Sequence, residues 1–161
     1  MQSEKNGAIR LRDYRVSDGD PAGELFFESI RVGAAEAYSE CERAAWASAP
    51  PQGEAWNQRL QQPISLVAED ERGLAGFMTL TAENCIDLAF VRSDRIGQGV
   101  AKALYDELLG RALALGKKKL FVQASLMARP FFERQGWTVR EERRPVLDGV
   151  ELTCFRMEFE A

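Results

Sequence analysis

Apolar and polar residues follow two different periods along this chain. Residues 9–16 alternate apolar and polar side chains, which is the period of a half-buried strand. Further on, apolar residues recur at the spacing of a helix with one buried face; they are Val100, Ala103, Leu104, Leu108, Ala112 and Leu115. Because segments of both kinds follow one another, the pattern predicts a mixed α/β fold.

Strands are predicted where short apolar or alternating runs are bounded by turn residues. They cover residues 9–16, 64–69, 74–80, 85–91, 120–124, 137–143 and 150–159. Asp70-Glu71-Arg72-Gly73 indicates a hairpin between the second and third of these strands. Leu147-Asp148-Gly149 indicates that the last two strands pair around a turn.

Helices are predicted over residues 21–38, 39–46, 54–61, 99–115 and 125–134. Asp18 or Asp20 is expected to cap the first, Ser39 and Glu42 form a capping box for the second, and Ser125 can cap the last. The sequence shows no internal repeat, low-complexity tract or linker. We therefore expect residues 1–161 to form one domain, with an ordered core from about residue 9 to residue 159.

The loop before the helix at residue 99 has the composition of an anion site. It delivers Gly97 and Gly99 to the first turn of that helix, whose backbone N–H groups have no acceptor within the helix. Without side chains at the glycines, an anion can lie directly on this backbone, at the positive end of the helix dipole. Lys102 and Arg95 add positive charge, so the loop is interpreted as a diphosphate site. The alternative is that the glycines only end a loop before a core helix.

The glycine loop does not match the sequence patterns of two other phosphate-binding loops. A nucleoside-triphosphate P-loop needs Gly-x4-Gly-Lys-Ser/Thr, and the sequence contains no such run. The dinucleotide-binding loop needs a third glycine where this chain has Lys102, and it follows its strand directly. Here five residues separate Val91 from Gly97.

Composition and charge exclude several classes of partner and site. The formal net charge of -4 and the short longest basic run, Lys117-Lys118-Lys119, argue against a nucleic-acid partner. No apolar run reaches membrane-spanning length, so we expect a cytoplasmic protein without membrane contact. Cys41, Cys85 and Cys154 are widely spaced, which favours free thiols. The chain has no histidine, so we expect no metal site and no histidine base.

Three motifs in order give the chain a resemblance to a known family. They are Gly76-Phe77 in the central hairpin, Gly97-Gln98-Gly99-Val100-Ala101 in the loop, and Ala-Arg-Pro-Phe-Phe-Glu-Arg-Gln-Gly-Trp at residues 128–137. With these motifs the sequence resembles the GNAT superfamily of acyl-CoA-dependent N-acetyltransferases, and within it a bacterial subgroup. The resemblance extends from about residue 9 to residue 159.

The resemblance implies a mixed, mostly antiparallel central sheet with flanking helices, in which two neighbouring parallel strands splay apart. Here they would be residues 85–91 and 120–124, and backbone groups in the gap would bind the pantetheine amides of acetyl-CoA. The residues implied to bind this cofactor lie on the first strand, in the glycine loop and near the late helix. They are Leu88, Ala89, Phe90, Val91, Ile96, Gly97, Gln98, Gly99, Val100, Ala101, Lys102, Ser125, Arg129 and Phe132.

Two positions depart from the family's pattern. Ile96 stands where glutamine or arginine is common, and backbone donors remain there. Phe132 stands where many relatives carry a tyrosine that protonates the leaving thiolate. A thiolate is a tolerable leaving group, and water, Ser125 or Tyr38 are alternative proton donors. Ser125 has the competing role of capping the helix that follows it.

Acetyl transfer also needs a base for the proton of the attacking amine and donors for the developing oxyanion. Backbone N–H groups near Phe90 can serve the oxyanion. Asp87 is the predicted base, because burial within the apolar run 86–91 would raise the pKa of its carboxyl group. Its period-two position assigns it to the face of Cys85 and Ala89, which we assign to the substrate cleft. The alternative is a structural ion pair between Asp87 and an arginine.

The acceptor site is expected among the N-terminal helices and the last hairpin. Of the aromatic residues there, Tyr38 is the candidate for the pocket, and the others are expected in the core: Phe26, Phe27, Trp46 and Trp56. Glu28 or Asp87 can attract a cationic amine. Glu28, Glu69 and Glu83 are secondary candidates for the base.

The predicted activity is direct transfer of an acetyl group from acetyl-CoA to a primary amine of a small molecule or peptide. A peptide N-terminus, a polyamine and an amino sugar all stay open, as does the oligomeric state, for which a homodimer is one option. One alternative is a non-catalytic acyl-CoA-binding sensor or regulatory module on the same fold, supported by Phe132 and the absence of histidine. Another is an unrelated α/β phosphate-binding domain.

Overall fold

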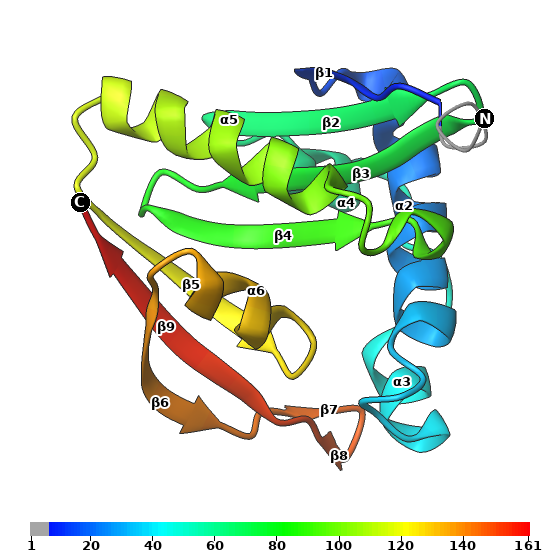
Figure 1. Ribbon diagram of the computed structural model, residues 1–161. Helices are drawn as coiled ribbons and strands as arrows, with labels where there is room; N and C mark the ends of the chain where they lie inside the picture. The colour runs from blue at the N-terminus through cyan, green and yellow to red at the C-terminus, as the bar shows by residue number, and fades with distance from the viewer. Residues whose placement is uncertain (1–6) are drawn as a thin grey trace.

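A seven-stranded sheet forms the centre of the computed structural model, which describes residues 7–161. Its strand order is β1-β2-β3-β4-β5-β9-β6, and only the pair of β4 and β5 is parallel (Figure 1). The strands are β1 (Arg10–Asp13), β2 (Ile64–Asp70), β3 (Gly73–Leu80), β4 (Cys85–Val91), β5 (Lys119–Ser125), β6 (Thr138–Arg143) and β9 (Cys154–Glu160). The predicted mixed, mostly antiparallel sheet is confirmed.

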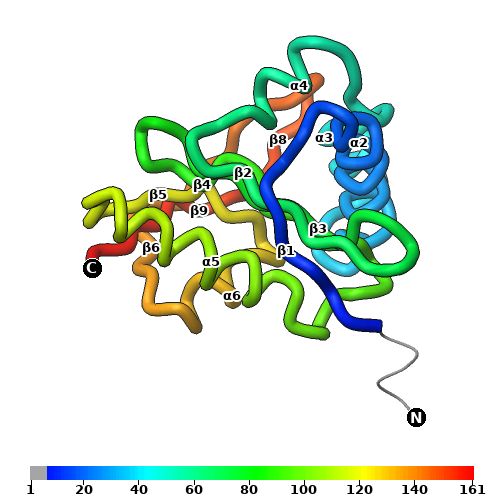
Figure 2. Tube along the Cα trace, turned by 90° about the horizontal axis from the view of Figure 1, so that it is seen from above, coloured from blue at the N-terminus to red at the C-terminus, as the bar shows by residue number. Residues whose placement is uncertain are grey.

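Helices cover both faces of this sheet (Figure 2). On one face lie α5 (Val100–Ala114) and α6 (Ala128–Arg134), and the buried Leu104 and Leu108 of α5 pack there with Met78. On the other lie α2 (Gly19–Glu28), α3 (Glu40–Trp46) and α4 (Glu54–Leu60), where Phe26 packs with Phe77. No helix in residues 7–161 combines the length and apolar character needed to cross a bilayer.

The parallel strands β4 and β5 pair only over a short stretch. The register joins Cys85 with Phe121 and Ile86 with Val122, and neither strand pairs with the other beyond those residues. β4 nevertheless continues to Val91, and β5 continues to Ser125. The two strands therefore part along their second halves, as the resemblance implied.

The first predicted helix is wrong in its second half. The α-helix ends at Glu28 and is followed by a π-helical turn, η2 (Ser29–Gly33). This segment contains serine, β-branched residues and glycine, which all have low helix propensity. The Ser29 hydroxyl also donates a hydrogen bond back to the carbonyl of Phe26. The predicted first strand is shortened to β1, whose register with β2 runs from Arg10 to Asp13.

The turn chemistry is confirmed in most places. Ser39 and Glu42 form the predicted capping box, with hydrogen bonds of 3.1 and 2.8 Å. Asp18 does not cap α2, because its carboxylate accepts the N–H of Arg15 and caps the preceding 3-10 turn, η1 (Val16–Asp18). Asp148 and Gly149 both have positive φ and join two further strands, β7 (Val146–Leu147) and β8 (Val150–Glu151).

Candidate active site

A cavity of about 570 Å³ lies where β4 and β5 part. This volume is typical of sites for small molecules. The predicted cofactor-binding residues that line it are Ala89, Phe90, Val91, Ile96, Gly97, Gly99, Val100, Ala101, Lys102, Ser125 and Phe132. The structure thus brings the strand, the glycine loop and the late helix to one site.

Three predicted residues have other surroundings. Leu88 is buried among the side chains on the α2 face of the sheet. The side-chain amide of Gln98 donates to the carbonyl of Asp94 at 2.9 Å. Arg129 forms an ion pair with Glu133 and lies over the ring of Phe155. These side chains do not line the cavity.

The remaining lining residues are not among the predicted cofactor-binding or catalytic residues, although Arg95 is the residue expected to add positive charge beside the loop. η2, α3 and the segment after η2 contribute Ser29, Ile30, Ala34 and Trp46, and α6 and its flanks contribute Met127, Ala128, Phe131, Arg134 and Gln135. Met78, Arg95 and Leu104 complete the wall. Those of α6 lie in or beside the motif at residues 128–137, which could have pointed to them. The side chains from η2 and α3 carry no such signal, since the fold alone brings them to β4.

The glycine loop is open to a ligand. Gly97 and Gly99 have φ angles of 81° and 89°, a conformation that favours glycine. A Cβ atom placed on either residue would meet no heavy atom within 4 Å. Gly99 is the N-cap of α5, a helix of fifteen residues, so the first amides of α5 point into this space without an acceptor in the helix. An anion fits here.

Charge is distributed unevenly along the cavity. Its charged lining residues are Arg95, Lys102 and Arg134, and no aspartate or glutamate belongs to the part of the lining that the structure describes. The end formed by η2 and α3 has Ser29 as its polar residue, beside Ile30, Ala34 and Trp46. Trp46 packs against Phe90 with a centroid separation of 6.5 Å. The end at the glycine loop therefore has the basic residues Arg95 and Lys102, which pair with Asp70 and Asp106 outside the lining, and the end formed by η2 and α3 is apolar and aromatic.

Asp87 forms the ion pair that was the alternative to its predicted role as a base. Its two carboxylate oxygens accept hydrogen bonds from Arg59 of α4 at 2.9 and 3.3 Å. The predicted face is wrong, because the register of β4 against β3 shifts at this residue and places a bulge there. As a result, Ala89 packs on the α5 side while Asp87 points toward α4. Asp87 does not line the cavity, but it is the first residue of β4 beyond the last pair with β5.

Tyr38 is buried and uses both functions of its hydroxyl group. The hydroxyl donates to the carbonyl of Thr153 at 2.7 Å and accepts the N–H of Leu126 at 2.9 Å. Burial raises the pKa of Tyr38, against the opposing effect of the bond from Leu126. These contacts tie the segment after η2 to the ends of β5 and β9. Tyr38 does not line the cavity.

The three secondary candidates for the base lie in other settings. Glu28 accepts hydrogen bonds from the backbone and hydroxyl of Ser93. Hydrogen bonds from Arg12 and Arg10 lower the pKa of Glu69 to about 2. Glu83 is exposed before β4. None of them lines the cavity.

The model of the acetyltransferase (GNAT) domain matches residues 34–159. The chain belongs to the GNAT acetyltransferase family. It is 29% identical over 151 residues to the uncharacterized N-acetyltransferase YafP of Escherichia coli K12, covering 94% of this chain and 95% of YafP.

Two solved GNAT-type structures give the same fold. A GCN5-related N-acetyltransferase from Rhodopseudomonas palustris superposes with a TM-score of 0.89 at 30% identity, covering 96% of this chain and 97% of that one. The PaiA N-acetyltransferase of Thermoplasma acidophilum, in complex with coenzyme A, has a TM-score of 0.75 at 19% identity. The coverage is 96% of this chain and all of the other.

Phe132, where the resemblance leads one to expect a tyrosine, is a buried ring in this GNAT chain. Phe132 packs edge-to-face against Tyr105, Phe131 and Trp137. The indole N–H of Trp137 donates to the hydroxyl of Tyr105 at 2.8 Å, so that phenol belongs to the core. Phe132 contributes apolar wall to the GNAT cavity.

Ser125 lies at the end of β5 in the same GNAT cavity. The N-cap of α6 is Met127, so Ser125 does not cap this helix as expected. The Ser125 hydroxyl oxygen instead accepts the N–H of Ala128, the first residue of α6, at 3.1 Å. Since this bond uses an oxygen lone pair, the hydroxyl hydrogen of Ser125 remains available to donate.

Among residues 7–161 no group of three acidic or cysteine side chains is arranged to hold a metal ion.

Proposed function

We propose that this GNAT protein transfers an acetyl group from acetyl-CoA directly to a primary amine. The observation that carries this proposal is the continuity of one cavity, from the glycine loop through the opening between β4 and β5 to the apolar end at η2 and α3. Such a cavity gives donor and acceptor access to one reaction point. The structure of a relative with bound coenzyme A supports the choice of donor.

The residues present fit the donor. The free amides at the start of α5 and the open space over Gly97 and Gly99 suit a diphosphate. Arg95 and Lys102 supply positive charge beside it. From Asp87 to Val91 the edge of β4 that faces β5 is unpaired with it, and so suits the amides of the pantetheine arm.

The chemistry requires one proton to leave the amine and one to reach the sulfur. Acetyl-CoA supplies the thioester carbonyl, whose C–S bond breaks as the N–C bond forms. We assign the sulfur's proton donor to Ser125, since its hydroxyl lies in the cavity with a free hydrogen, whereas that of Tyr38 is held by Thr153. Asp87, beside the opening between β4 and β5, stays the proposed base. The amine's proton would reach it through a water molecule, after the ion pair between Asp87 and Arg59 has opened.

The lining favours one class of acceptor. A polyamine or an amino sugar carries several cationic groups, which are costly to bury without carboxylates. The apolar end offers Ile30, Ala34, Trp46 and Phe90 instead. We therefore propose a monoamine carried on an apolar or aromatic group.

The test is release of coenzyme A thiol across a panel of amines with acetyl-CoA. We expect turnover with alkyl or aromatic monoamines and at least tenfold lower kcat/KM with polyamines and amino sugars. The reverse order would exclude the proposed acceptor class but leave acetyl transfer intact.

Phe132 favours a second candidate, an acyl-CoA-binding module without turnover. Calorimetric titration with acetyl-CoA and desulfo-CoA, combined with the thiol-release panel, separates the two. Tight binding with no thiol release for any amine would support the module, and no binding would exclude both.

A further inference from the structure

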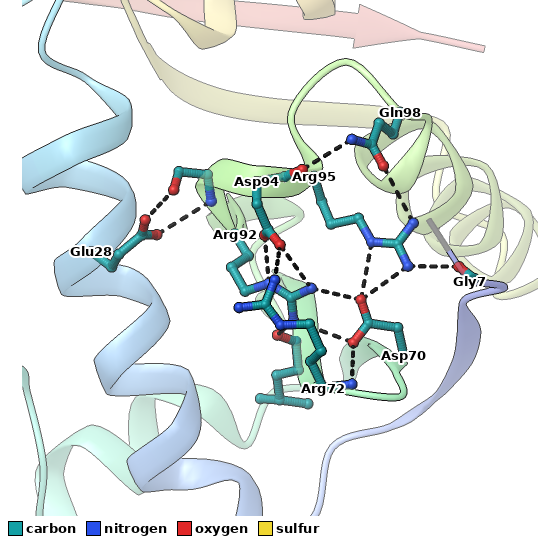
Figure 3. Close-up of polar contacts among 10 residues, drawn as sticks. Gly7, Glu28, Asp70, Arg72, Arg92, Asp94, Arg95 and Gln98 are labelled. Atoms are coloured by element: carbon teal, nitrogen blue, oxygen red, sulfur yellow. Dashed lines mark hydrogen bonds and ion pairs between the residues drawn. The ribbon is translucent and has the colours of Figure 1, made fainter. Parts of the chain in front are cut away.

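One of the contacts that attach the glycine loop to the rest of the protein is a buried carboxylate, and this contact has no role in the chemistry proposed above. Asp70 is the last residue of β2, and its side chain is 1% exposed. It accepts hydrogen bonds from Arg92 at 2.6 Å and from Arg95 at 3.0 Å, and from the backbone N–H of Arg72 at 2.8 Å (Figure 3).

Arg92 directly precedes the short turn η3 (Ser93–Arg95), and Arg95 is the last residue of this turn, from which the glycine loop starts. Arg92 also donates to the carbonyl of Leu74 at 2.8 Å, which ties the turn to β3. Arg95 donates to the carbonyl of Gly7 and contacts the side chain of Gln98 inside the loop. Gln98 in turn donates to the carbonyl of Asp94, so the loop is cross-linked at both ends (Figure 3).

We propose that Asp70 is a positioning residue for the donor's diphosphate: it holds Arg95 and Arg92 so that the loop presents its free amides in one fixed arrangement. This inference rests on the proposed donor, acetyl-CoA. Asp70 does not line the cavity, whereas Arg95 does. A carboxylate that orients two guanidinium groups fixes their geometry before the ligand arrives, which lowers the entropy lost on binding. Without the Asp70 carboxylate, the guanidinium groups of Arg92 and Arg95 would lie side by side and would lose the buried anion that they share.

The test compares donors with and without the diphosphate. Asp70→Asn keeps the shape of the side chain but removes its charge. We expect it to raise the Kd of CoA and the KM of acetyl-CoA by about 10–100-fold, with kcat within about threefold of the original. With S-acetyl-pantetheine, which lacks the diphosphate, kcat/KM should change by less than about threefold. Asp70→Glu should recover part of the affinity for CoA.

Asp18→Asn is the matched control. Asp18 is also a buried carboxylate that accepts two guanidinium hydrogen bonds, both from Arg12, and one from a backbone N–H, that of Arg15. We expect Asp18→Asn to lower the stability of the protein but to change kcat/KM by the same factor with acetyl-CoA and with S-acetyl-pantetheine. If Asp70→Asn does not fold, Asp94→Asn tests the same network from its exposed side, because Asp94 accepts from Arg92 and Arg72. It should show a smaller loss, about threefold, that is again limited to the diphosphate donor.

An equal loss with both donors, or an unchanged Kd for CoA in folded Asp70→Asn, would overturn the positioning role. Failure of the unaltered protein to bind CoA would instead overturn the proposed function. The two failures are therefore distinguishable.

Discussion

The two ends of the cavity are held in place by different kinds of contact. At the glycine loop, where we propose that the donor binds (the donor end), charged hydrogen bonds from β2, the β2–β3 hairpin and α2 reach the turn before the loop, through Asp70, Arg72 and Glu28. At η2 and α3, where we propose that the acceptor binds (the acceptor end), aromatic rings pack together: Trp46 lies edge-to-face with Tyr38 at 5.3 Å and beside Phe90. A polar network is directional, so it defines one geometry, whereas apolar packing accepts many shapes.

This difference matches the two tasks of a transferase. A donor that is always the same molecule benefits from a rigid, charge-complementary site. An acceptor is selected by the size and polarity of a pocket, where each methylene group changes affinity by only about 1–3 kcal/mol. The predictions below test this division, from the largest expected effect to the smallest.

Asp87→Asn should have the largest effect if Asp87 takes the amine's proton at the opening between the two ends. We expect kcat/KM to fall by roughly 10²–10⁴-fold with unchanged CoA binding. The control is Arg59→Gln, which breaks the same ion pair but keeps the carboxylate. It should change the rate by less than about tenfold, measured as thiol release over pH. Equal losses in both variants would mean that the ion pair is structural.

Gly99→Asp should disable the donor end alone. The new side chain would place a negative charge in the open space over the loop, so we expect CoA binding to weaken by about 100-fold, or ~2.7 kcal/mol. Gly53→Asp is the matched control, because Gly53 has a φ of 91° and is the N-cap of α4. Its CoA-dependent rise in Tm should equal that of the unaltered protein. An undiminished rise in Gly99→Asp would contradict the loop assignment.

The residues of the proposed donor end can be picked out from the sequence because they are neighbours along the chain. β4, the loop and α5 follow one another, so the glycines and the apolar spacing after them indicate a candidate diphosphate site without knowledge of the rest. The acceptor end combines η2, α3 and the end of β5, which are distant in sequence. The π-turn at Ser29 leaves no periodic signal, and Trp46 is indistinguishable from a core residue in the sequence.

Asp87 illustrates why period alone can fail. Its assignment to the face of Ala89 assumes an unbroken strand, but the bulge at Asp87 reverses the alternation. Tyr38 illustrates a second limit, since its phenol is identified by type, while its partners at Thr153 and Leu126 are set by tertiary contacts. Both depend on how strands pair, which the local pattern does not contain.

Lowering the pH should weaken the donor end through Asp70. Although burial raises its pKa, hydrogen bonds from Arg92, Arg72 and Arg95 hold the pKa of Asp70 at about 2. A lowered pKa stabilises the fold above pH ~4, and this contribution is lost as the pH falls from about 4 to about 2. In urea titrations, the unfolding free energy of the unaltered protein should therefore approach that of Asp70→Asn over this range, by roughly 2 kcal/mol. A constant difference between the two proteins would contradict this.

Phe132→Tyr should have the smallest effect. In the proposed reaction the sulfur is protonated between the donor end and the acceptor end, and there Ser125 already offers a hydroxyl as proton donor. A CoA thiolate is far less basic than an alkoxide, so its protonation need not limit the rate. We expect a change in kcat of less than about tenfold, under ~1.4 kcal/mol of barrier.

The paired variants identify the donor of that proton. Tyr38→Phe should cost about 1–3 kcal/mol of stability, since it removes two partly buried hydrogen bonds to backbone groups, and should leave the rate near its original value. If Ser125→Ala lowers the rate, Phe132→Tyr in that background should recover it, because a phenol at residue 132 would replace the missing hydroxyl. If Phe132→Tyr alone turned on an otherwise silent protein, the native chain would be an acyl-CoA-binding module, and its apolar end would select a ligand without acetylating it.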